Sequence, residues 1–235
     1  DIMNKTPKIS LKIIRSYNNK YYIQINDKIA KTPEDNLMAL PTLKLAKIIL
    51  KDYQSYKTKR NTSIVSPIKL TNTAIDKVAE DKNNYIKQLC SYANSDLVCY
   101  FASSPEDLVK KQNKSWLPLI TFMQDFYNIN ILYTTEIFSI NQNKESLSKL
   151  KAILSKKNNF ELSAISVLSQ LTSSIIISLA LVNDKINVKN AFELSNLEEI
   201  YQSTFWGKDE EAFTRLKAIS IDIKNVKKYY DALKD

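Results

Sequence analysis

The sequence predicts an α+β fold, in which an N-terminal mixed α+β domain with a small antiparallel sheet precedes an all-helical C-terminal domain. β-Branched and aromatic residues crowd two short runs within residues 10–31. From residue 142 onward, apolar residues recur at helical spacing and nothing strand-like remains. The 235 residues are 44% hydrophobic and 25% charged, a globular composition with enough apolar residues for a core. We therefore expect one domain over residues 1–141 and another over 142–235.

The expected sheet lies at the start of the chain. Asn18-Asn19 separates its two main runs, and Asn26-Asp27 marks a second turn, because both residue types tolerate the left-handed conformation. Residues 32–42 are expected to form a loop and a short strand. Pro41-Thr42 then opens a helix that extends to about Tyr56.

Helices and buried runs alternate from residue 66 to residue 141. Residue 66 begins an extended stretch that becomes helical from about Asn72, and a helix is expected over 84–93. The apolar run 96–102 is interpreted as a buried strand, and the run 129–140 is also strand-like.

The segment between those two runs has a clear helix start. Ser103 or Ser104 is expected to cap it, with Pro105 in the first turn and acidic residues at the positive end of the helix dipole. This helix should extend to about Trp116, and Pro118 should start or kink the next one.

The stretch Leu162–Asn183 contains no charged residue and is long enough to cross a bilayer. Polar residues interrupt it in nearly every turn, which favours a central core helix over a membrane span. The interrupting residues are Ser163, Ser166, Ser169, Gln170, Thr172, Ser173, Ser174 and Ser178. We expect no membrane insertion.

Basic charge is concentrated near the N-terminus, where residues 1–66 hold 13 basic and 5 acidic side chains. A solvated lysine face, an acidic partner and nucleic acid would each be compatible with this excess. The chain has only three arginines, the residue preferred for base and bidentate phosphate contacts, so nucleic acid is disfavoured. The two cysteines, Cys90 and Cys99, form no disulfide framework and indicate a reducing compartment, for which a bacterial cytoplasm fits best.

The composition excludes most familiar catalytic machinery. The chain has no histidine, which rules out Ser-His-Asp and Cys-His catalysis and histidine metal sites. A single glycine rules out glycine-rich phosphate loops, so we expect no catalytic residue, metal or cofactor. Carboxylate-only catalysis remains the alternative. The acidic groups for it are Glu198-Glu199, Asp209-Glu210-Glu211 and Asp76 with Glu80, which are usually solvated faces or helix-start charges.

Gly207, the only glycine, follows Phe205-Trp206 and precedes an acidic run. We expect it to end one helix in the left-handed conformation, with Asp209 capping the next helix. Trp206 either packs under this corner or is presented to a partner, and both interpretations stay open.

Four ordered blocks of the sequence resemble the ATP synthase assembly factor two family, the "ATP-twelve" chaperones. They are KTPEDNLMALPTLKLAKII, SPIKLTNTAIDKV, YANSDLVCYFASSPEDLVKKQNKSWLPLI and LSNLEEIYQSTFWGKDEEA. The central motif residues are all in place, namely Asn72, Asp76, Asp96, Gln112, Trp116, Glu198, Glu199, Gln202, Trp206 and Gly207. The sequence departs from the family pattern at Tyr53, Phe101, Leu117 and Asn196, where the family has Trp, Arg, Asp and Arg.

The resemblance implies a chaperone without ATPase activity that binds the unassembled alpha subunit of the ATP synthase catalytic sector and shields the surface that later meets beta. It also implies an N-terminal α+β domain followed by a helical domain. We expect a monomer in the bacterial cytoplasm, with the mitochondrial matrix as the equivalent compartment in eukaryotes. The alternatives are a carboxylate-dependent hydrolase and a basic nucleic-acid-binding module.

An aromatic anchor surrounded by acids suits reversible holding of a subunit. We therefore predict a partner-binding set on the helices around Gly207, consisting of Glu198, Glu199, Gln202, Trp206 and Asp209. In the competing interpretation, Glu198 or Glu199 forms a salt bridge to a neighbouring helix.

Overall fold

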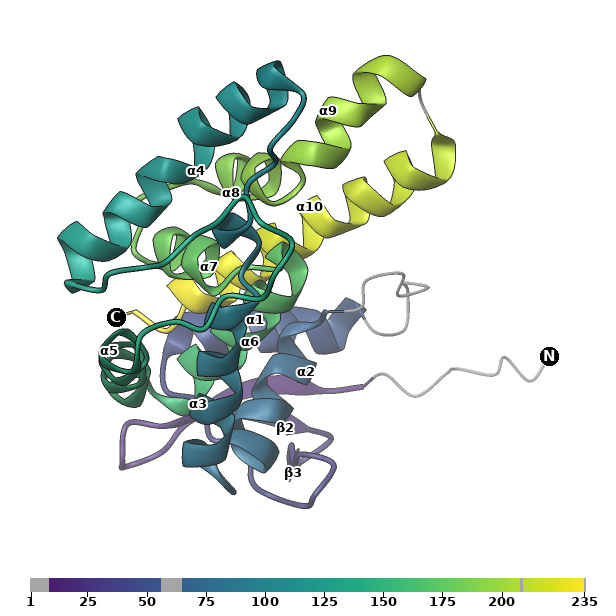
Figure 1. Cartoon of the computed structure of the whole chain (residues 1–235). Coiled ribbons are helices and arrows are strands. Elements are labelled where there is room, and N and C mark those ends of the chain that lie inside the picture. The colour runs from purple at the N-terminus through teal and green to yellow at the C-terminus, as the bar shows by residue number, and fades with distance from the viewer. Residues whose placement is uncertain (1–8, 56–64, 208, 235) are drawn as a thin grey trace.

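The computed structural model describes residues 9–55, 65–207 and 209–234, apart from the side chain of Trp206. A small sheet lies beside a body of helices, as expected for the α+β class (Figure 1). The strands are β1 Leu11–Arg15, β2 Tyr21–Ile25 and β3 Lys28–Ile29. The α-helices are α1 Leu43–Ser55, α2 Pro67–Asn72, α3 Lys82–Ser91, α4 Glu106–Tyr127, α5 Lys144–Ser155, α6 Asn159–Thr172, α7 Ile175–Val182, α8 Val188–Ser195, α9 Leu197–Trp206 and α10 Glu210–Asp231.

The sheet confirms the strand prediction. Its order is β1-β2-β3, both pairs are antiparallel, and the register of the first pair joins Leu11 to Ile25. Asn19, Asn26 and Asp27 all have positive φ angles, as the turn residues were expected to have. The segment after β3 forms isolated bridges rather than the expected short strand.

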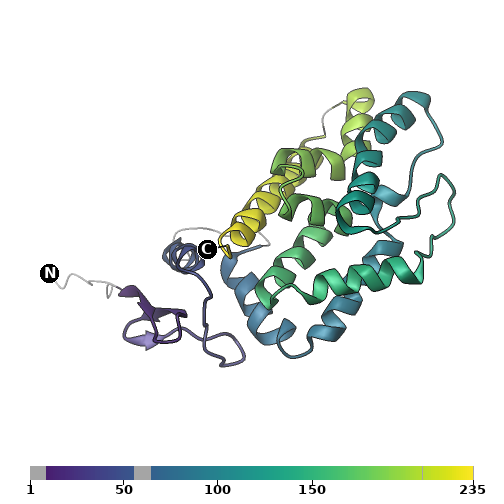
Figure 2. The same cartoon turned by 90° about the vertical axis from the view of Figure 1, so that its left-hand side faces the viewer.

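Helix α1 packs on β1 and β2, and this N-terminal unit lies at one side of the other helices (Figure 2). The end of α10 ties the two together, because Thr42 Oγ1 donates to the carbonyl of Ala232 and Lys44 Nζ donates to that of Lys234. The last helix therefore buttresses the start of α1.

The centre of the helical body consists of α6 and α7, and every residue of α7 is buried. The uncharged stretch is two helices and not the single core helix that the sequence predicted. Ser173 takes a left-handed conformation with φ 54°, and the Ser174 side chain then accepts from Ile177 N at 2.9 Å to cap α7. A serine at this position competes for backbone hydrogen bonds and restarts the helix. Among the described residues, no helix combines the length and apolar character needed to cross a bilayer.

Two predicted strands are wrong. The run 96–102 contains the 3-10 turn Leu97–Cys99, and residues 129–140 form a loop, joined to it by a single parallel bridge between Tyr100 and Thr134. Val98 and Cys99 are fully buried, so the apolar run signalled burial without signalling strand geometry.

The helix expected from Asn72 begins earlier, at Pro67. Ser66 is its N-cap, and the Ser66 side chain accepts a hydrogen bond from Lys69 N at 3.1 Å. Pro67 suits the first position of the helix, because a backbone N–H there would have no partner within the helix. The chain continues from α2 into the π-helical segment Thr73–Val78 and, after α3, into the 3-10 turn Tyr92–Asn94.

Helix α4 also differs from the prediction. Pro105 is its N-cap, no serine side chain caps it, and the helix continues unbroken through Pro118 to Tyr127. Asn128 ends it in the left-handed conformation, with φ 55°.

The predicted domain boundary after residue 141 lies in the loop between α4 and α5. Helices from both sides of it pack together: α3 contacts α5, and α4 contacts α7 and α9. One hydrophobic cluster includes buried residues from Ile23 to Ala232. The division into 1–141 and 142–235 remains a proposal, and the packing links its two halves closely.

Candidate partner-binding site

The predicted partner-binding residues gather at the outer end of two helices. Helices α9 and α10 are joined at one extremity of the helical body and run inward from it (Figure 1). Residues 198–207 and 209–216 are called the α9–α10 tip below. Local signals build it, because Gly207 ends α9 and the Asp209 carboxylate starts α10 by accepting from Glu211 N at 2.9 Å and from Ala212 N.

Gly207 has a positive φ of 84°, as expected, but its ψ of 178° is extended. The predicted left-handed helical cap is therefore wrong in its ψ angle. This region of conformational space is open essentially to glycine alone, so the requirement for glycine is stricter than predicted. A Cβ at this position would meet no atom within 4 Å, so the constraint comes from the backbone and not from packing.

A crevice of about 320 Å³ separates the two helices at the tip. Three of the predicted residues, Glu199, Gln202 and Asp209, line it, and Phe213 and Leu216 supply its apolar wall. A broader, shallower hollow adjoins it beside Glu210, Glu211 and Arg215 and shares Glu199 and Asp209. The tip thus combines acidic and apolar surface.

Two phenylalanines stand out at the tip. Phe205 has 65% and Phe213 has 61% of its surface exposed, and the Phe205 ring lies 5.1 Å from that of Tyr201. The binding set predicted from the sequence contains neither phenylalanine. Their position on either side of the only glycine was the available signal. The side chain of Trp206, the predicted anchor, lies outside the described residues.

The two glutamates make contacts within the chain. The Arg215 guanidinium pairs with Glu199 Oε1 across the tip, and Glu198 Oε1 accepts from Gln112 Nε2 at 2.7 Å. Glu198 thus ties α9 to α4, whereas Glu199 bridges α9 and α10 on a partly exposed surface. The salt bridge considered as the competing interpretation exists for Glu199, and it leaves Glu199 on the crevice wall.

Gln112 and Trp116 hold the base of α9. Both side chains are buried on α4. Gln112 Oε1 accepts from Ala102 N at 2.6 Å, while Trp116 Nε1 donates to the Leu194 carbonyl at 3.0 Å just before α9. A further bond joins Tyr201 Oη to Asp107 Oδ2 at 2.8 Å. These contacts fix the direction in which the tip projects.

The other motif residues lie away from the tip and organise loops. Asp76 accepts from Thr32 Oγ1 at 2.6 Å and from Asn36 Nδ2 at 2.9 Å, which pins residues 32–36 to the π-helical segment. Burial raises the pKa of Asp76, but these hydrogen bonds outweigh it and hold the pKa below its usual value. Asn72 Oδ1 is buried and has no hydrogen-bond partner among the described residues.

Asp96 is buried at the start of α7. Its two carboxylate oxygens accept from Val98 N at 3.1 Å and from Ile176 N at 3.0 Å. Burial nevertheless dominates and raises the pKa of Asp96 to about 6, because no cation compensates the lost hydration.

The family departures sit in self-consistent surroundings. Phe101 packs edge-on against Trp116 with ring centroids 5.4 Å apart, and Asn196 donates back to the Phe192 carbonyl at 2.9 Å. Leu117 is half-buried against the core, and Tyr53 Oη lies 3.9 Å from Met38 Sδ. Apolar packing and local hydrogen bonds occupy these positions.

The acidic groups considered for catalysis lie in separate parts of the molecule, although Glu199, Asp209, Glu210 and Glu211 share the shallow hollow at the tip. Asp76 is engaged in pinning a loop, while Glu198 and Glu199 contact Gln112 and Arg215 on different sides of α9. Within the described part of the chain, no group of three or more His, Cys, Asp or Glu side chains is arranged to hold a metal ion.

Comparison with known proteins identifies the family of the chain. Residues 8–124 match the model of the ATP12 chaperone protein family. The chain belongs to the ATP12 chaperone family. The mitochondrial protein atp12 of Schizosaccharomyces pombe is 24% identical over 210 residues, covering 83% of this chain and 71% of that protein.

Solved structures share the ATP12 fold over nearly the whole chain. Atp12 from Paracoccus denitrificans is 25% identical and superposes with a TM-score of 0.84 over 96% of both chains. The Atu1473 protein of Agrobacterium tumefaciens is also 25% identical, with a TM-score of 0.89 over 96% of this chain and 84% of that one. Family membership supports the broad assignment of the chain as an ATP synthase assembly chaperone.

Proposed function

We propose that this ATP12-family chain binds the unassembled alpha subunit of the ATP synthase catalytic sector and shields it until it pairs with beta. The contact is made through the α9–α10 tip. The observation that carries the proposal is the placement of Glu199, Gln202 and Asp209 around one crevice beside exposed Phe213.

Exposed aromatic side chains next to a crevice are the surface a holding chaperone needs. Phe205 and Phe213 expose apolar area that a client can cover, and desolvated aromatic side chains supply much of the energy at protein interfaces. Trp206 lies between them in the sequence and is proposed as a further anchor.

The acidic residues supply orientation and exchange. Glu199 lines both the crevice and the adjoining hollow, and Arg215 lines the hollow. Their ion pair is partly exposed, so a charged group of the client can compete for either partner. Charges of this kind speed association and set register more than they add affinity. A chaperone has to release its client, so modest affinity with fast exchange suits the role.

The absence of a histidine and of glycine-rich loops in the sequence supports the part of the proposal that concerns catalysis and cofactors. We propose a monomer that acts without catalysis and without a cofactor. A bacterial cytoplasm is the proposed compartment, with the mitochondrial matrix as its eukaryotic equivalent. Nucleic acid is not a proposed partner, because only three arginines are available for phosphate and base contacts.

Purified alpha subunit provides the test. Alpha subunit is diluted from denaturant, and its aggregation is followed by light scattering with increasing amounts of this chain and then of beta subunit. We expect suppression to saturate near one chain per alpha subunit and beta to displace the chain. Unchanged scattering at a several-fold excess of chain would refute the proposed function.

A further inference from the structure

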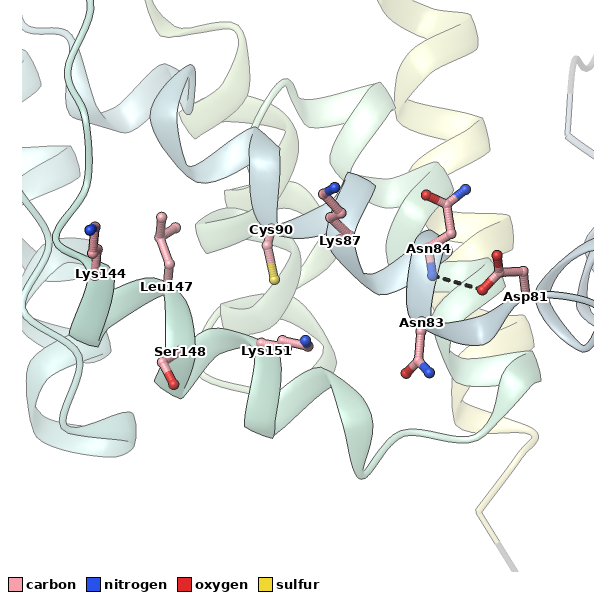
Figure 3. Close-up of a pocket in the computed structure, with 9 residues that line it drawn as sticks. All are labelled: Asp81, Asn83, Asn84, Lys87, Cys90, Lys144, Leu147, Ser148 and Lys151. Atoms are coloured by element: carbon pink, nitrogen blue, oxygen red, sulfur yellow. Dashed lines mark hydrogen bonds between the residues drawn. The ribbon is translucent and has the colours of Figure 1, made fainter.

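A second hollow lies away from the tip, between α3 and α5. It has a volume of about 570 Å³ and is called the α3–α5 groove below. Its lining residues are Asp81, Asn83, Asn84, Lys87, Cys90, Lys144, Leu147, Ser148 and Lys151 (Figure 3). In both overall views, α3 and α5 lie at the other end of the helical body from the outer end of α9 and α10.

Sequence spacing explains why these side chains share one surface. The α5 contributors are Lys144, Leu147, Ser148 and Lys151, at positions i, i+3, i+4 and i+7, which form one stripe along a helix. The α3 contributors repeat with nearly the same period. The helices run antiparallel, since Lys82 at the start of α3 donates to the Ser155 carbonyl at the end of α5. The two stripes therefore face each other along the groove.

The groove carries excess positive charge. Lys87, Lys144 and Lys151 are exposed, and within the described ranges no carboxylate forms an ion pair with any of them. Asp81, the one acid in the lining, is committed to capping α3 by accepting from Asn84 N at 3.0 Å. Elsewhere on α5, Glu145 pairs with Lys149 at 2.7 Å and does not line the groove.

The position of Lys144 adds to the positive potential. It is the first residue of α5, where the helix dipole is positive and a cation is unfavourable without a counterion. Glu145 in the same turn already has Lys149 as its partner. An anion in the groove would relieve this repulsion.

The floor of the groove is apolar. Leu147 and Cys90 are half-buried there, and Cys90 Sγ points from α3 toward α5 (Figure 3). Burial raises the pKa of the Cys90 thiol, although the nearby Lys151 charge works in the opposite direction. Apolar floor between lysines favours a ligand that alternates carboxylates with an apolar group.

The arrangement favours an extended ligand over a compact one. The three lysine side chains do not converge on one point, and Lys144 lies at one end of the groove (Figure 3). From Lys144 to Lys151 the α5 stripe spans roughly 10 Å at the rise of an α-helix. Three residues of extended peptide cover about the same length. The lining has no arginine or glycine-rich cradle of the kind that recognises phosphate.

We propose that the α3–α5 groove binds an extended acidic peptide segment of a partner protein. Lys87, Lys144 and Lys151 hold its carboxylates, and an apolar side chain between them rests on Leu147 and Cys90. The proposal does not depend on the identity of the client at the tip.

Cys90 reports occupancy of the groove directly. Cys99 is fully buried, so a neutral maleimide should modify Cys90 alone in the native protein, and Cys90→Ser verifies this assignment. The rate of modification is measured at low salt with and without the capped peptide Glu-Glu-Leu-Glu-Glu. The Gln-Gln-Leu-Gln-Gln peptide, inorganic phosphate and ATP are tested in parallel.

We expect the glutamate peptide to slow modification and the glutamine peptide, phosphate and ATP to have no such effect. In the triple variant Lys87→Gln, Lys144→Gln, Lys151→Gln, the apparent Kd from protection should rise about tenfold, because three modest ion pairs are lost together. Rates are compared as ratios with and without peptide, since Lys151 also influences the thiol.

A matched variant changes the net charge equally at a distance, through Lys20→Gln, Lys28→Gln and Lys47→Gln on exposed sites of the N-terminal unit. It should keep full protection. Absence of protection by the glutamate peptide, or equal loss of protection in both triple variants, overturns the proposal. Protection by phosphate or ATP but not by the glutamate peptide also overturns it in favour of a small anion. None of these outcomes involves the alpha subunit, so they are independent of the proposed function.

Discussion

The α6–α7 centre and the α9–α10 tip both combine apolar and polar side chains, but the centre buries them and the tip exposes them. In the centre, apolar side chains are fully buried, and hydroxyls are bonded to backbone carbonyls, as Ser163 Oγ is to that of Leu70 at 2.8 Å. At the tip, Phe205 and Phe213 are mostly exposed, and the acids line a crevice.

The comparison shows which part of the chain stabilises the fold and which part is available for contact. The centre has satisfied its apolar surface and its polar groups internally, so it has nothing to offer a partner. The tip leaves apolar surface exposed and leaves acidic groups facing solvent, so both are available to a partner. Substitutions should therefore affect stability in one region and client binding in the other.

The largest expected effect is loss of stability in the centre. Leu168→Ala removes a fully buried side chain from α6 and should lower the free energy of unfolding by about 2–5 kcal/mol. Phe213→Ala, at the tip, should change it by less than about 0.5 kcal/mol. Urea unfolding of both variants measures the contrast, and equal losses would break the distinction between the two regions.

The second effect is a pH dependence in the centre. The folded-state pKa of Asp96 is raised to about 6, so the native state holds a proton that the unfolded chain releases near pH 4. The contribution of Asp96 is most favourable below about pH 4 and declines as pH rises through 6, by roughly 3 kcal/mol in all. The pKa of Asp76 is lowered, so its contribution to stability depends on pH in the opposite direction and is lost as pH falls.

Urea midpoints of the wild type and Asp96→Asn at pH 4.5 and pH 7 test this prediction. The stability of the wild type relative to Asp96→Asn should be greater at pH 4.5 than at pH 7. A difference that stays constant between the two pH values would mean that Asp96 does not titrate in this range.

A smaller effect is expected at the turn of the tip. Gly207→Val should lower the free energy of unfolding by more than about 1 kcal/mol, because a β-branched residue is strained at φ 84° and ψ 178°. A Cβ at this position would have no atom within 4 Å, so Gly207→Ala should suffer the same backbone strain without a clash. Thermal unfolding measures both, and an unchanged melting temperature in Gly207→Val would contradict the observed backbone angles.

The smallest effect on stability is expected for the ion pair at the tip. Glu199→Lys should change the free energy of unfolding by at most about 1 kcal/mol, because its pair with Arg215 is partly exposed. It should nevertheless weaken alpha-subunit binding. Glu198→Lys breaks the bond to Gln112, so it should destabilise the chain more than Glu199→Lys does. Urea unfolding and the aggregation assay on the same samples separate the two roles, and a folded Glu199→Lys protein with full protective activity would remove Glu199 from the binding site.

The sequence was most informative where local chemistry determines structure. Asn19 and Asn26 marked the turns of the sheet, and Asp209 marked the start of α10, because each acts through its own or nearby backbone. The buried runs 96–102 and 129–140 were misjudged as strands, since burial arises from tertiary packing and a short apolar run carries no unambiguous period. Ser66 and Pro67 form a sound start signal for α2, although the helix was expected to begin only at about Asn72.

The candidate site was predictable only in part. The predicted binding set includes Glu199, Gln202 and Asp209, and the structure brings these three residues to one crevice. The bond between Glu198 and Gln112 joins residues 86 positions apart, and the exposure of Phe213 depends on how α10 lies relative to the other helices. Neither follows from spacing along the chain, because both are set by how separate helices pack.

We propose that the α9–α10 tip holds the client while the helical centre holds the fold. The most direct test of this division is the double variant Phe205→Ala, Phe213→Ala, measured for urea unfolding and for the Kd of purified alpha subunit on the same preparation. We expect an unchanged unfolding midpoint and a Kd raised at least about tenfold, since truncation of buried interface aromatics commonly costs more than 1 kcal/mol each. An unchanged Kd in a folded double variant would contradict it and place the client elsewhere on the molecule.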